Sequence, residues 1–138
     1  MPAKILYIED SPDDATLLQL AFRKAAVQAE LEIATDGEKA IAALQNGAGT
    51  GTGCVLLDLK LPGLSGLQVL SWIRDQSRFK RLPVIVFTSS SLPSDINQAY
   101  ESGANSYLVK PSSLAGLIEL ARTIDQYWLH TNTPPTPL

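Results

Sequence analysis

The stretch CVLLDLKLPGLSGLQVLSWI, from Cys54 to Ile73, decides the fold class of this chain. It opens with an apolar run, Cys54 to Leu57, which is typical of a strand covered on both faces. Asp58 and a Leu-Pro-Gly turn follow. Apolar residues then recur at the i, i+3, i+4, i+7 spacing of an amphipathic helix, at Gly66, Val69, Leu70 and Ile73. The stretch therefore predicts one strand–turn–helix unit.

The same alternation continues in both directions. Further strands are expected at Ile5 to Ile8, Leu31 to Ala34, Val84 to Phe87 and Ser106 to Val109. Helical spacing lies at Leu18, Ala21, Phe22 and Ala25, and at Ile96, Ala99, Tyr100 and Gly103. Alternating strands and helices predict parallel strands with helices on both faces of the sheet. We expect an α/β protein with an open, doubly wound (βα)5 sheet and the flavodoxin-like strand order 2-1-3-4-5.

Helix ends carry signals of their own. A Ser or Thr followed three residues later by Glu or Gln predicts a capping box, and a glycine after the last turn predicts a C-cap. Thr35 with Glu38 and Ser65 with Gln68 fit the capping box, and Gly103 fits the C-cap. Ser11, Pro12 and Asp14 predict a cap, a proline at the first helical position and an acid in the first turn. Asp36-Gly37 is expected to be a turn without a chemical role.

Length and composition fit one small domain. A chain of 138 residues can bury a core without disulfide or metal staples, and Cys54 is expected to be a buried, inert thiol in a reducing compartment. We expect a domain over residues 1–130 and a disordered Pro/Thr tail over 131–138. Residues 46–53 predict a flexible loop and no P-loop, because no Gly-Lys-Ser/Thr ending opens a helix there.

Charge and hydropathy exclude several classes of partner. The net charge is −3 and no Lys/Arg cluster stands out, which argues against nucleic acid. No apolar run reaches the length of a membrane span, and the N-terminal run is too short for a signal peptide. We therefore expect a cytoplasmic protein. His130 lies near a polar end without an obvious partner and is given no role.

Polar residues end four of the predicted strands. Glu9 and Asp10 follow the first, Asp58 the third, Thr88 the fourth and Lys110 the fifth. In an open parallel sheet, ligands bind beyond the carboxyl ends of the strands, where strand order reverses. Each residue alone would pass for a helix cap, a strand former or a surface lysine. Their shared position at consecutive strand ends predicts one site.

Three acids at one edge repel one another unless a counter-charge joins them. A hard divalent cation such as Mg2+ or Mn2+ resolves this repulsion, because it takes oxygen ligands and keeps positions open for water and phosphate. Asp58 would then be a nucleophile of aspartyl-phosphate chemistry. Phosphoryl transfer needs mainly positioning and charge neutralisation, which the cation and Lys110 would supply, while Thr88 could donate to a phosphoryl oxygen.

Four motifs in this order resemble the receiver domain of the two-component response-regulator family, from Lys4 to about Tyr127. They are IED with SP from Ile8, LLDLKLPGLSGLQVL from Leu56, PVIVFTSS from Pro83 and GANSYLVKP from Gly103. The resemblance implies a single-domain phosphoacceptor switch, not a turnover enzyme. A sensor histidine kinase would pass its phosphoryl group to Asp58.

The resemblance also implies roles for the other residues. Asp10 would bind the metal directly beside Asp58 and the backbone carbonyl of Lys60. Thr88 would be the switch hydroxyl and Tyr107 the switch aromatic. Lys110 would bind phosphate, and the Lys110-Pro111 peptide bond is expected to be cis.

Two positions depart from the family pattern. Glu9 stands where the family more often has Asp, and its longer side chain is expected to reach the metal through water. Lys60 puts a cation two residues after the phosphoacceptor, a position that influences dephosphorylation in this family.

The last predicted helix has apolar residues around about half its circumference, more than one core face needs. Aromatic residues are enriched at interfaces. The Asp58–Gly66 stretch and the extended C-terminus are similar to cyanobacterial regulators partnered with phytochrome kinases, which dimerise through the fourth helix, fifth strand and fifth helix. We expect a homodimer through this face, and the interface candidates are Tyr100, Ile124, Tyr127 and Trp128. The alternative is that the helix only covers its own sheet.

Three other functions fit less well. A phosphatase with an aspartyl nucleophile needs a second Asp at the position of Lys60. A flavodoxin-like FMN carrier needs a phosphate loop where Glu9 and Asp10 stand. A receiver scaffold that works without phosphorylation would not need Asp10, Asp58, Thr88 and Lys110 together.

Overall fold

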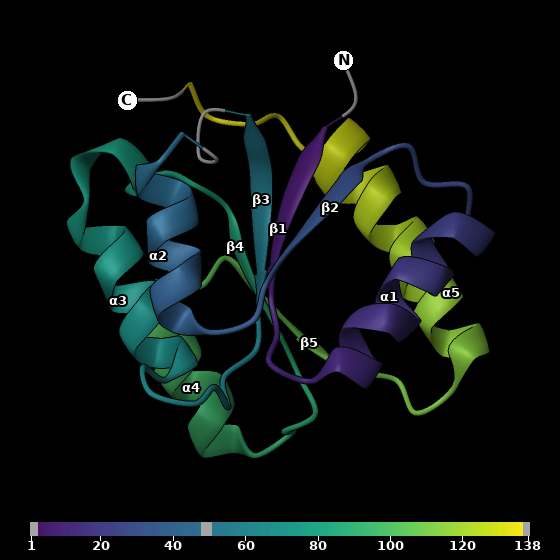
Figure 1. Cartoon of the computed structure of the whole chain (residues 1–138), viewed down its shortest axis with the longest axis horizontal. Coiled ribbons are helices and arrows are strands. Elements are labelled where there is room, and N and C mark those ends of the chain that lie inside the picture. Colours follow the sequence, from purple (N-terminus) through teal and green to yellow (C-terminus); the bar gives the residue numbers. More distant parts are fainter. Residues whose placement is uncertain (1–2, 48–50, 137–138) are drawn as a thin grey trace.

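The computed structural model describes residues 3–47 and 51–136 and contains, within them, a five-stranded sheet and five α-helices (Figure 1). The strands are β1 (Lys4–Ile8), β2 (Glu30–Ala34), β3 (Thr52–Leu57), β4 (Val84–Thr88) and β5 (Ser106–Val109). The helices are α1 (Pro12–Lys24), α2 (Gly37–Gln45), α3 (Gly66–Asp75), α4 (Pro93–Glu101) and α5 (Leu114–Ile124). A 3-10 turn, η2 (Ser77–Phe79), precedes β4, and a π-helical segment, η3 (Asp125–Thr131), extends α5.

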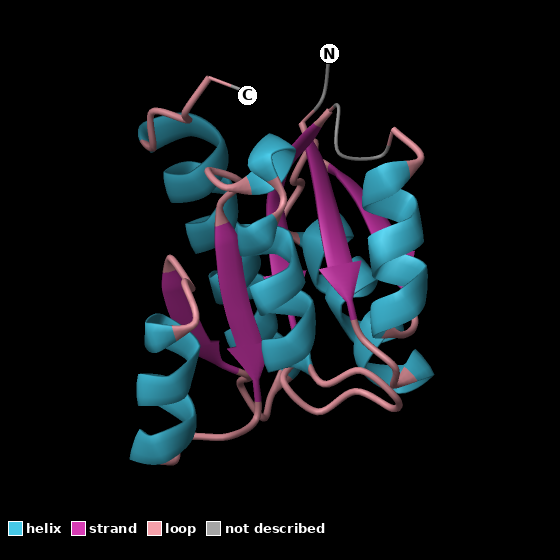
Figure 2. Cartoon of the chain, turned by 90° about the vertical axis from the view of Figure 1, so that its left-hand side faces the viewer, coloured by secondary structure: helices cyan, strands magenta, loops and turns pink. Residues whose placement is uncertain are grey.

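All strand pairs are parallel, and the order is β2-β1-β3-β4-β5, as predicted. Helices α1 and α5 cover one face of the sheet, and α2, α3 and α4 cover the other (Figures 1 and 2). The order reverses at β1 and β3, whose last residues Ile8 and Leu57 are paired. This pairing brings the segments after both strands together at the carboxyl edge.

The core has one cluster of apolar side chains on each face of the sheet. Strands β1, β3 and β4 are almost wholly buried, which matches their continuous apolar runs. The outer strands β2 and β5 are only partly covered. Cys54 is 1% exposed, so the prediction of a buried thiol is confirmed, and burial raises its pKa to about 12.

Most of the predicted caps are present. The Ser11 side chain accepts from the Asp14 backbone N–H at 3.2 Å, and Ser65 and Gln68 form the reciprocal bonds of a capping box. Gly103 follows α4 with a φ of +106°, a conformation that favours glycine.

The predicted cap at Thr35 is wrong. Helix α2 begins one residue later, so Asp36 is the N-cap, and its Oδ1 accepts from the Lys39 backbone N–H at 2.7 Å. The Thr35 hydroxyl lies 3.1 Å from Lys39 Nζ instead. Gly37 is also more than a turn residue, because a Cβ there would lie 2.7 Å from the Val69 side chain.

The segment η3 continues the packing of α5 on the core. Trp128 and Leu129 of η3 contact the cluster between the sheet and α1/α5. Residues 132–136 have no regular structure, and Arg81 Nη1 donates to the Thr136 carbonyl at 3.4 Å. The expected loop at 46–53 falls partly on residues 48–50, outside the described residues, and β3 already begins at Thr52. Among the helices described, none is long and apolar enough to cross a membrane.

Arg74, near the end of α3, braces the edge of the sheet opposite the carboxyl ends. Its guanidinium donates to the carbonyls of Leu82 at 2.7 Å and Gly103 at 2.9 Å, and to Asn105 Oδ1 at 2.8 Å. Asn105 Oδ1 also accepts from the Val84 backbone N–H at 2.8 Å. One side chain therefore joins α3 to the segments that lead into β4 and β5.

Replacing Arg74 by Met should lower the free energy of unfolding by about 2–4 kcal/mol, because several partly buried acceptors lose their donor together. Arg78→Met is the matched control. The Arg78 guanidinium lies over the Phe79 ring, so its loss should cost below about 1 kcal/mol. Urea unfolding of both variants checks this, and an equal loss in the two would contradict a bracing role.

Candidate metal centre at the carboxyl edge of the sheet

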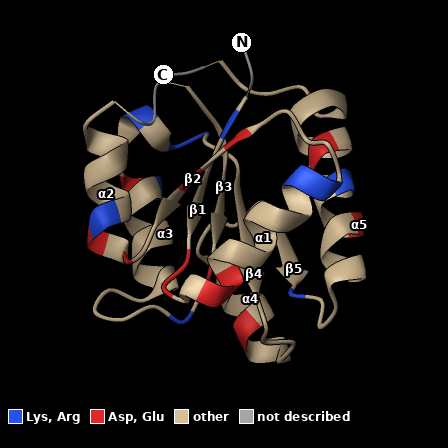
Figure 3. Cartoon of the chain, turned by 45° about the vertical axis from the view of Figure 1, so that its right-hand side comes forward, with Lys and Arg blue, Asp and Glu red and all other residues tan. Residues whose placement is uncertain are grey.

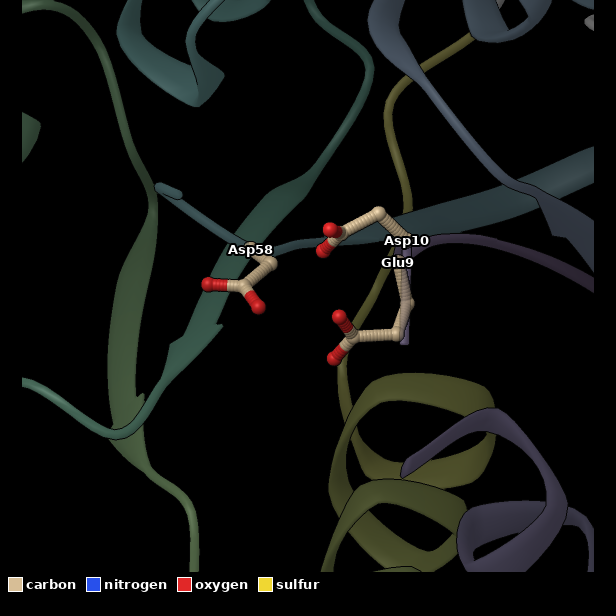
Figure 4. Close-up of side chains that lie close together, drawn as sticks. All are labelled: Glu9, Asp10 and Asp58. Carbon is tan, nitrogen blue, oxygen red and sulfur yellow. The ribbon is translucent and has the colours of Figure 1, made fainter. Parts of the chain in front are cut away.

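Glu9, Asp10 and Asp58 converge beyond the ends of β1 and β3. One carboxylate oxygen from each lies within 4.8 Å of the others, and Figure 4 shows the Glu9 and Asp10 carboxylates both directed toward Asp58. Glu9 is 1% and Asp58 7% exposed, whereas Asp10 is exposed. The predicted acidic site is therefore present, with two acids inside the protein and one at its rim.

Backbone contacts hold Asp58 in place. Its N–H donates to the Ile8 carbonyl at 3.1 Å, and its Oδ1 accepts from the Lys60 N–H at 3.3 Å. Gly66, the first residue of α3, packs directly on this segment, since a Cβ there would lie 2.2 Å from the Asp58 carbonyl oxygen. The start of α3 therefore fixes the path of the chain after Asp58.

Lys110 reaches this edge from the end of β5. Its Nζ lies 3.0 Å from Asp58 Oδ2 and 2.9 Å from Asp14 Oδ2, and it also contacts Glu9 Oε1. The expected cis bond between Lys110 and Pro111 is absent. The trans form is the more stable isomer of an X–Pro bond, and the flexible four-carbon stem of lysine brings the ammonium to the acids from it.

The charged groups of the site shift one another's pKa values. Burial would raise the pKa of Asp58, but the hydrogen bond and charge of Lys110 outweigh it and hold that pKa below its ordinary value. Burial raises the pKa of Glu9, and the Asp58 charge adds to this. Burial would lower the pKa of Lys110, but its bonds to the carboxylates raise it. Asp58 and Lys110 are therefore an ionised pair.

Tyr7 is a member of the site that the sequence did not reveal. Its side chain is fully buried on β1, and its hydroxyl donates to Glu9 Oε1 at 3.0 Å, while the Ser11 N–H donates to Glu9 Oε2 at 3.3 Å. Burial raises the Tyr7 pKa, and the Glu9 charge adds to this. In an apolar run, a tyrosine looks like any core aromatic. Its position two residues before Glu9, on the same face of β1, is the one signal that could have found it.

Asp14 is the second addition. The sequence identified it as an acid of the first helical turn, which it is, but its side chain also crosses from α1 to the end of β5. Figure 3 shows the acidic residues that gather where β1 leads into α1. Asp14 lies in the first helical turn after Glu9 and Asp10, and this position was a signal that it could belong to the site. Asp13 lies in the same turn, so the signal did not distinguish the two acids.

Thr88 and Tyr107 lie at the neighbouring strands. Thr88 ends β4, is 1% exposed, and its hydroxyl has no hydrogen-bond partner in the described part of the chain, although it faces Asp58 closely enough to stabilise the carboxylate. The Tyr107 hydroxyl donates to the Ser90 carbonyl at 2.8 Å, and burial raises its pKa. The Lys60 side chain is exposed.

This arrangement fits a divalent cation. The Lys110 ammonium contacts three carboxylates, and Asp10 adds a fourth beside Glu9 and Asp58, so negative charge is left in excess. Hard cations prefer carboxylate oxygens, and Asp10 and Asp58 offer them between the interior and the rim. The residues present can therefore hold Mg2+ or Mn2+.

The interface candidates differ in position. Tyr100 on α4 and Tyr127 on η3 are each 49% exposed. Trp128 is partly buried and packs edge-to-face on Tyr127, with ring centroids 5.1 Å apart. Ile124 is 1% exposed and belongs to the core. Its selection as an interface residue is corrected, because the α5 face that carries it turns toward the sheet.

Known proteins share both sequence and fold with this chain. The family model described as "Response regulator receiver domain" matches residues 5–122. The chain is 37% identical over 139 residues to the probable methanogenesis regulatory protein FilR2 of Methanothrix harundinacea, covering 99% of this chain and 90% of that protein. It is 36% identical over 138 residues to response regulator Rcp1 of Synechocystis sp., covering 97% and 94%.

Solved structures agree with these matches. The phosphorylated cyanobacterial phytochrome response regulator RcpA superposes with a TM-score of 0.89 at 33% identity, over 99% of this chain and 100% of that one. The Mn2+-bound form of Rcp1 superposes with a TM-score of 0.83 at 37% identity, over 98% and 100%. This chain belongs to the response regulator receiver domain family, whose members are signalling phosphoacceptors.

Proposed function

We propose that a sensor histidine kinase phosphorylates this response regulator on Asp58. One observation carries the proposal: Asp58 lies between the carboxylate cluster, the Lys110 ammonium and the buried hydroxyl of Thr88, which has no hydrogen-bond partner among the described residues. Buried polar groups are seldom left without a partner. A phosphoryl group on Asp58 would give the Thr88 hydroxyl an acceptor.

In the proposed reaction, an Asp58 carboxylate oxygen attacks the phosphorus of a phosphohistidine. The new O–P bond forms as the P–N bond breaks, and the imidazole leaves with its electron pair and takes up a proton. Lys110 neutralises charge that collects on the phosphoryl oxygens. Asp10 and Asp58 would hold a divalent cation, which would supply further neutralisation of charge when bound. The chain's own contribution is to aim these groups before the reaction.

We propose that Asp10, Asp58 and the Lys60 backbone carbonyl bind Mg2+ or Mn2+ directly. Glu9 would act through water, which agrees with its two oxygens already accepting from Tyr7, Ser11 and Lys110. The relative Rcp1 was solved in a Mn2+-bound form, which supports the choice of metal.

Signalling would follow from the Thr88 hydroxyl turning toward the phosphoryl group. Tyr107 is placed to respond to this movement, because its hydroxyl donates to the Ser90 carbonyl in the segment that follows Thr88. We propose that the equilibrium of this segment and of α4 shifts on phosphorylation. The signal would be passed on through contact with another protein.

The kinase partner is proposed to be a phytochrome, because RcpA is a phytochrome response regulator and shares 33% identity over nearly the whole chain.

A cytoplasmic location, expected from the sequence, belongs to the same proposal. So does a homodimer through α4, β5 and α5, supported by the exposed side chains of Tyr100, Val109 and Tyr127.

Removing one direct ligand should weaken the metal site. Asp10→Asn should raise the dissociation constant for Mg2+ by at least about tenfold, measured by isothermal titration calorimetry. Asp13→Asn removes an equal charge from the nearby first turn of α1 and should change it little. Equal weakening in both variants would mean that general charge, not ligation, holds the cation.

Incubation with acetyl phosphate and Mg2+ should add one phosphoryl group to the protein, because Asp58 is the ionised acid beside Lys110. Intact-mass spectrometry should show this gain in the wild type and in Asp75→Asn, an acid at the end of α3, and none in Asp58→Asn. The proposed function is wrong if the wild type gains no mass or if Asp58→Asn gains as much.

Loss of an aromatic anchor should weaken the proposed dimer by about tenfold or more. Sedimentation velocity of the phosphorylated protein should show dimers for the wild type and for Leu17→Ser, which alters an exposed apolar residue on α1. Tyr127→Ser should shift the protein toward monomer. A wild type that stays monomeric at high concentration, with and without phosphate, would refute the dimer.

A further inference from the structure

Asp14 contacts the Lys110 ammonium although 96 positions separate the two residues in the chain. Its Oδ2 lies 2.9 Å from Nζ, with the Asp14 side chain 43% and the Lys110 side chain 13% exposed. The Asp14 backbone N–H is used in the cap of α1, where Ser11 accepts it. The cap fixes the backbone, so the side chain is directed from α1 toward the end of β5.

An ammonium has three N–H donors, and Lys110 has three carboxylate partners: Glu9, Asp14 and Asp58. Asp58 is the group that reacts, so its contact with Lys110 must change when a phosphoryl group arrives. Glu9 and Asp14 take no covalent part and can keep their contacts. They are placed to hold the ammonium while its third N–H moves to a phosphoryl oxygen.

Lys110 also has room to leave Asp58. A hollow of about 90 Å³ lies beside it, and Tyr7, Asp14, Phe87 and Leu117 contribute to its lining. The ammonium is 5.8 Å from the centre of the Phe87 ring, a further attraction on that side. Glu9 alone would leave the lysine stem free to turn into this hollow.

We propose that Asp14 is a positioning residue that, together with Glu9, holds the Lys110 ammonium toward Asp58. The proposal rests on the proposed function of Asp58. It assigns Asp14 no contact with the metal or with the phosphoryl group. Its effect on the reaction passes through Lys110, by keeping the lysine oriented before transfer.

Asp14 could instead serve only as an acid in the first turn, where negative charge stabilises a helix. Asp13 distinguishes the two roles. It occupies the same turn and carries the same charge, but it makes no ion pair within the described residues. A variant of Asp13 therefore reproduces the loss of helix stabilisation and of local charge while leaving Lys110 untouched.

The experiment measures the rate constant of phosphorylation by acetyl phosphate, at saturating Mg2+, in Asp14→Asn, Asp14→Glu and Asp13→Asn. Asp14→Asn should lower it by about fivefold or more relative to Asp13→Asn, because a misplaced group slows transfer. The Mg2+ dissociation constant should differ by less than about twofold between the two, since neither residue is a proposed ligand. Asp14→Glu should restore most of the rate, because it returns the carboxylate.

A second readout does not depend on phosphorylation. The side-chain ammonium of Lys110 should give a protected ¹H–¹⁵N NMR signal, assigned by its absence in Lys110→Arg. This signal should persist in Asp13→Asn and be lost or broadened in Asp14→Asn. If the wild type is not phosphorylated, the proposed function of Asp58 fails, and the NMR signal alone decides whether Asp14 holds the lysine.

Three results would overturn the positioning role. Equal slowing in the Asp13 and Asp14 variants would assign the effect to general charge. Faster phosphorylation of Asp14→Asn would mean that Asp14 withholds the lysine. An ammonium signal that is unchanged in Asp14→Asn would mean that the lysine needs no second carboxylate.

Discussion

The ion pairs of Lys110 are the interaction on which the carboxyl edge depends. Glu9 and Asp58 are buried together, and two carboxylates at short range cannot both be ionised without a nearby positive charge. The Lys110 ammonium contacts both. This balance keeps Asp58 charged inside the protein, as its proposed role as nucleophile requires. The remaining negative charge is what gives the same edge its affinity for a divalent cation.

Strand pairing and helix packing hold this edge of the sheet in place. Parallel β1 and β3 end at the same level because Ile8 pairs with Leu57, and the start of α3 at Gly66 packs against the Asp58 backbone. At the opposite edge, Arg74 ties α3 to the segments before β4 and β5. Arg74 therefore holds together the edge of the sheet that lies opposite the acidic site.

Most residues of the site could be predicted from their position at the ends of strands. Asp10, Asp58, Thr88 and Lys110 each come directly after or at the end of an apolar run, and parallel strands put such residues on one edge. The residue at which a helix begins was harder to predict than the helix itself. The spacing of Thr35 and Glu38 fits a capping box, but α2 begins at Gly37, so the N-cap is Asp36, another residue type that caps helices well.

The sequence by itself determined the alternation of strands and helices, the acids and the lysine at the strand ends, and the resemblance to receiver domains. These depend on local periodicity and on rules for parallel sheets. Only the tertiary structure decided that Tyr7 bonds Glu9, that Asp14 meets Lys110 and that Ile124 is buried. The reason is physical. Each of these depends on how far a side chain reaches across a packed interface, or on which face of a helix meets the sheet, and neither is encoded in spacing along the chain.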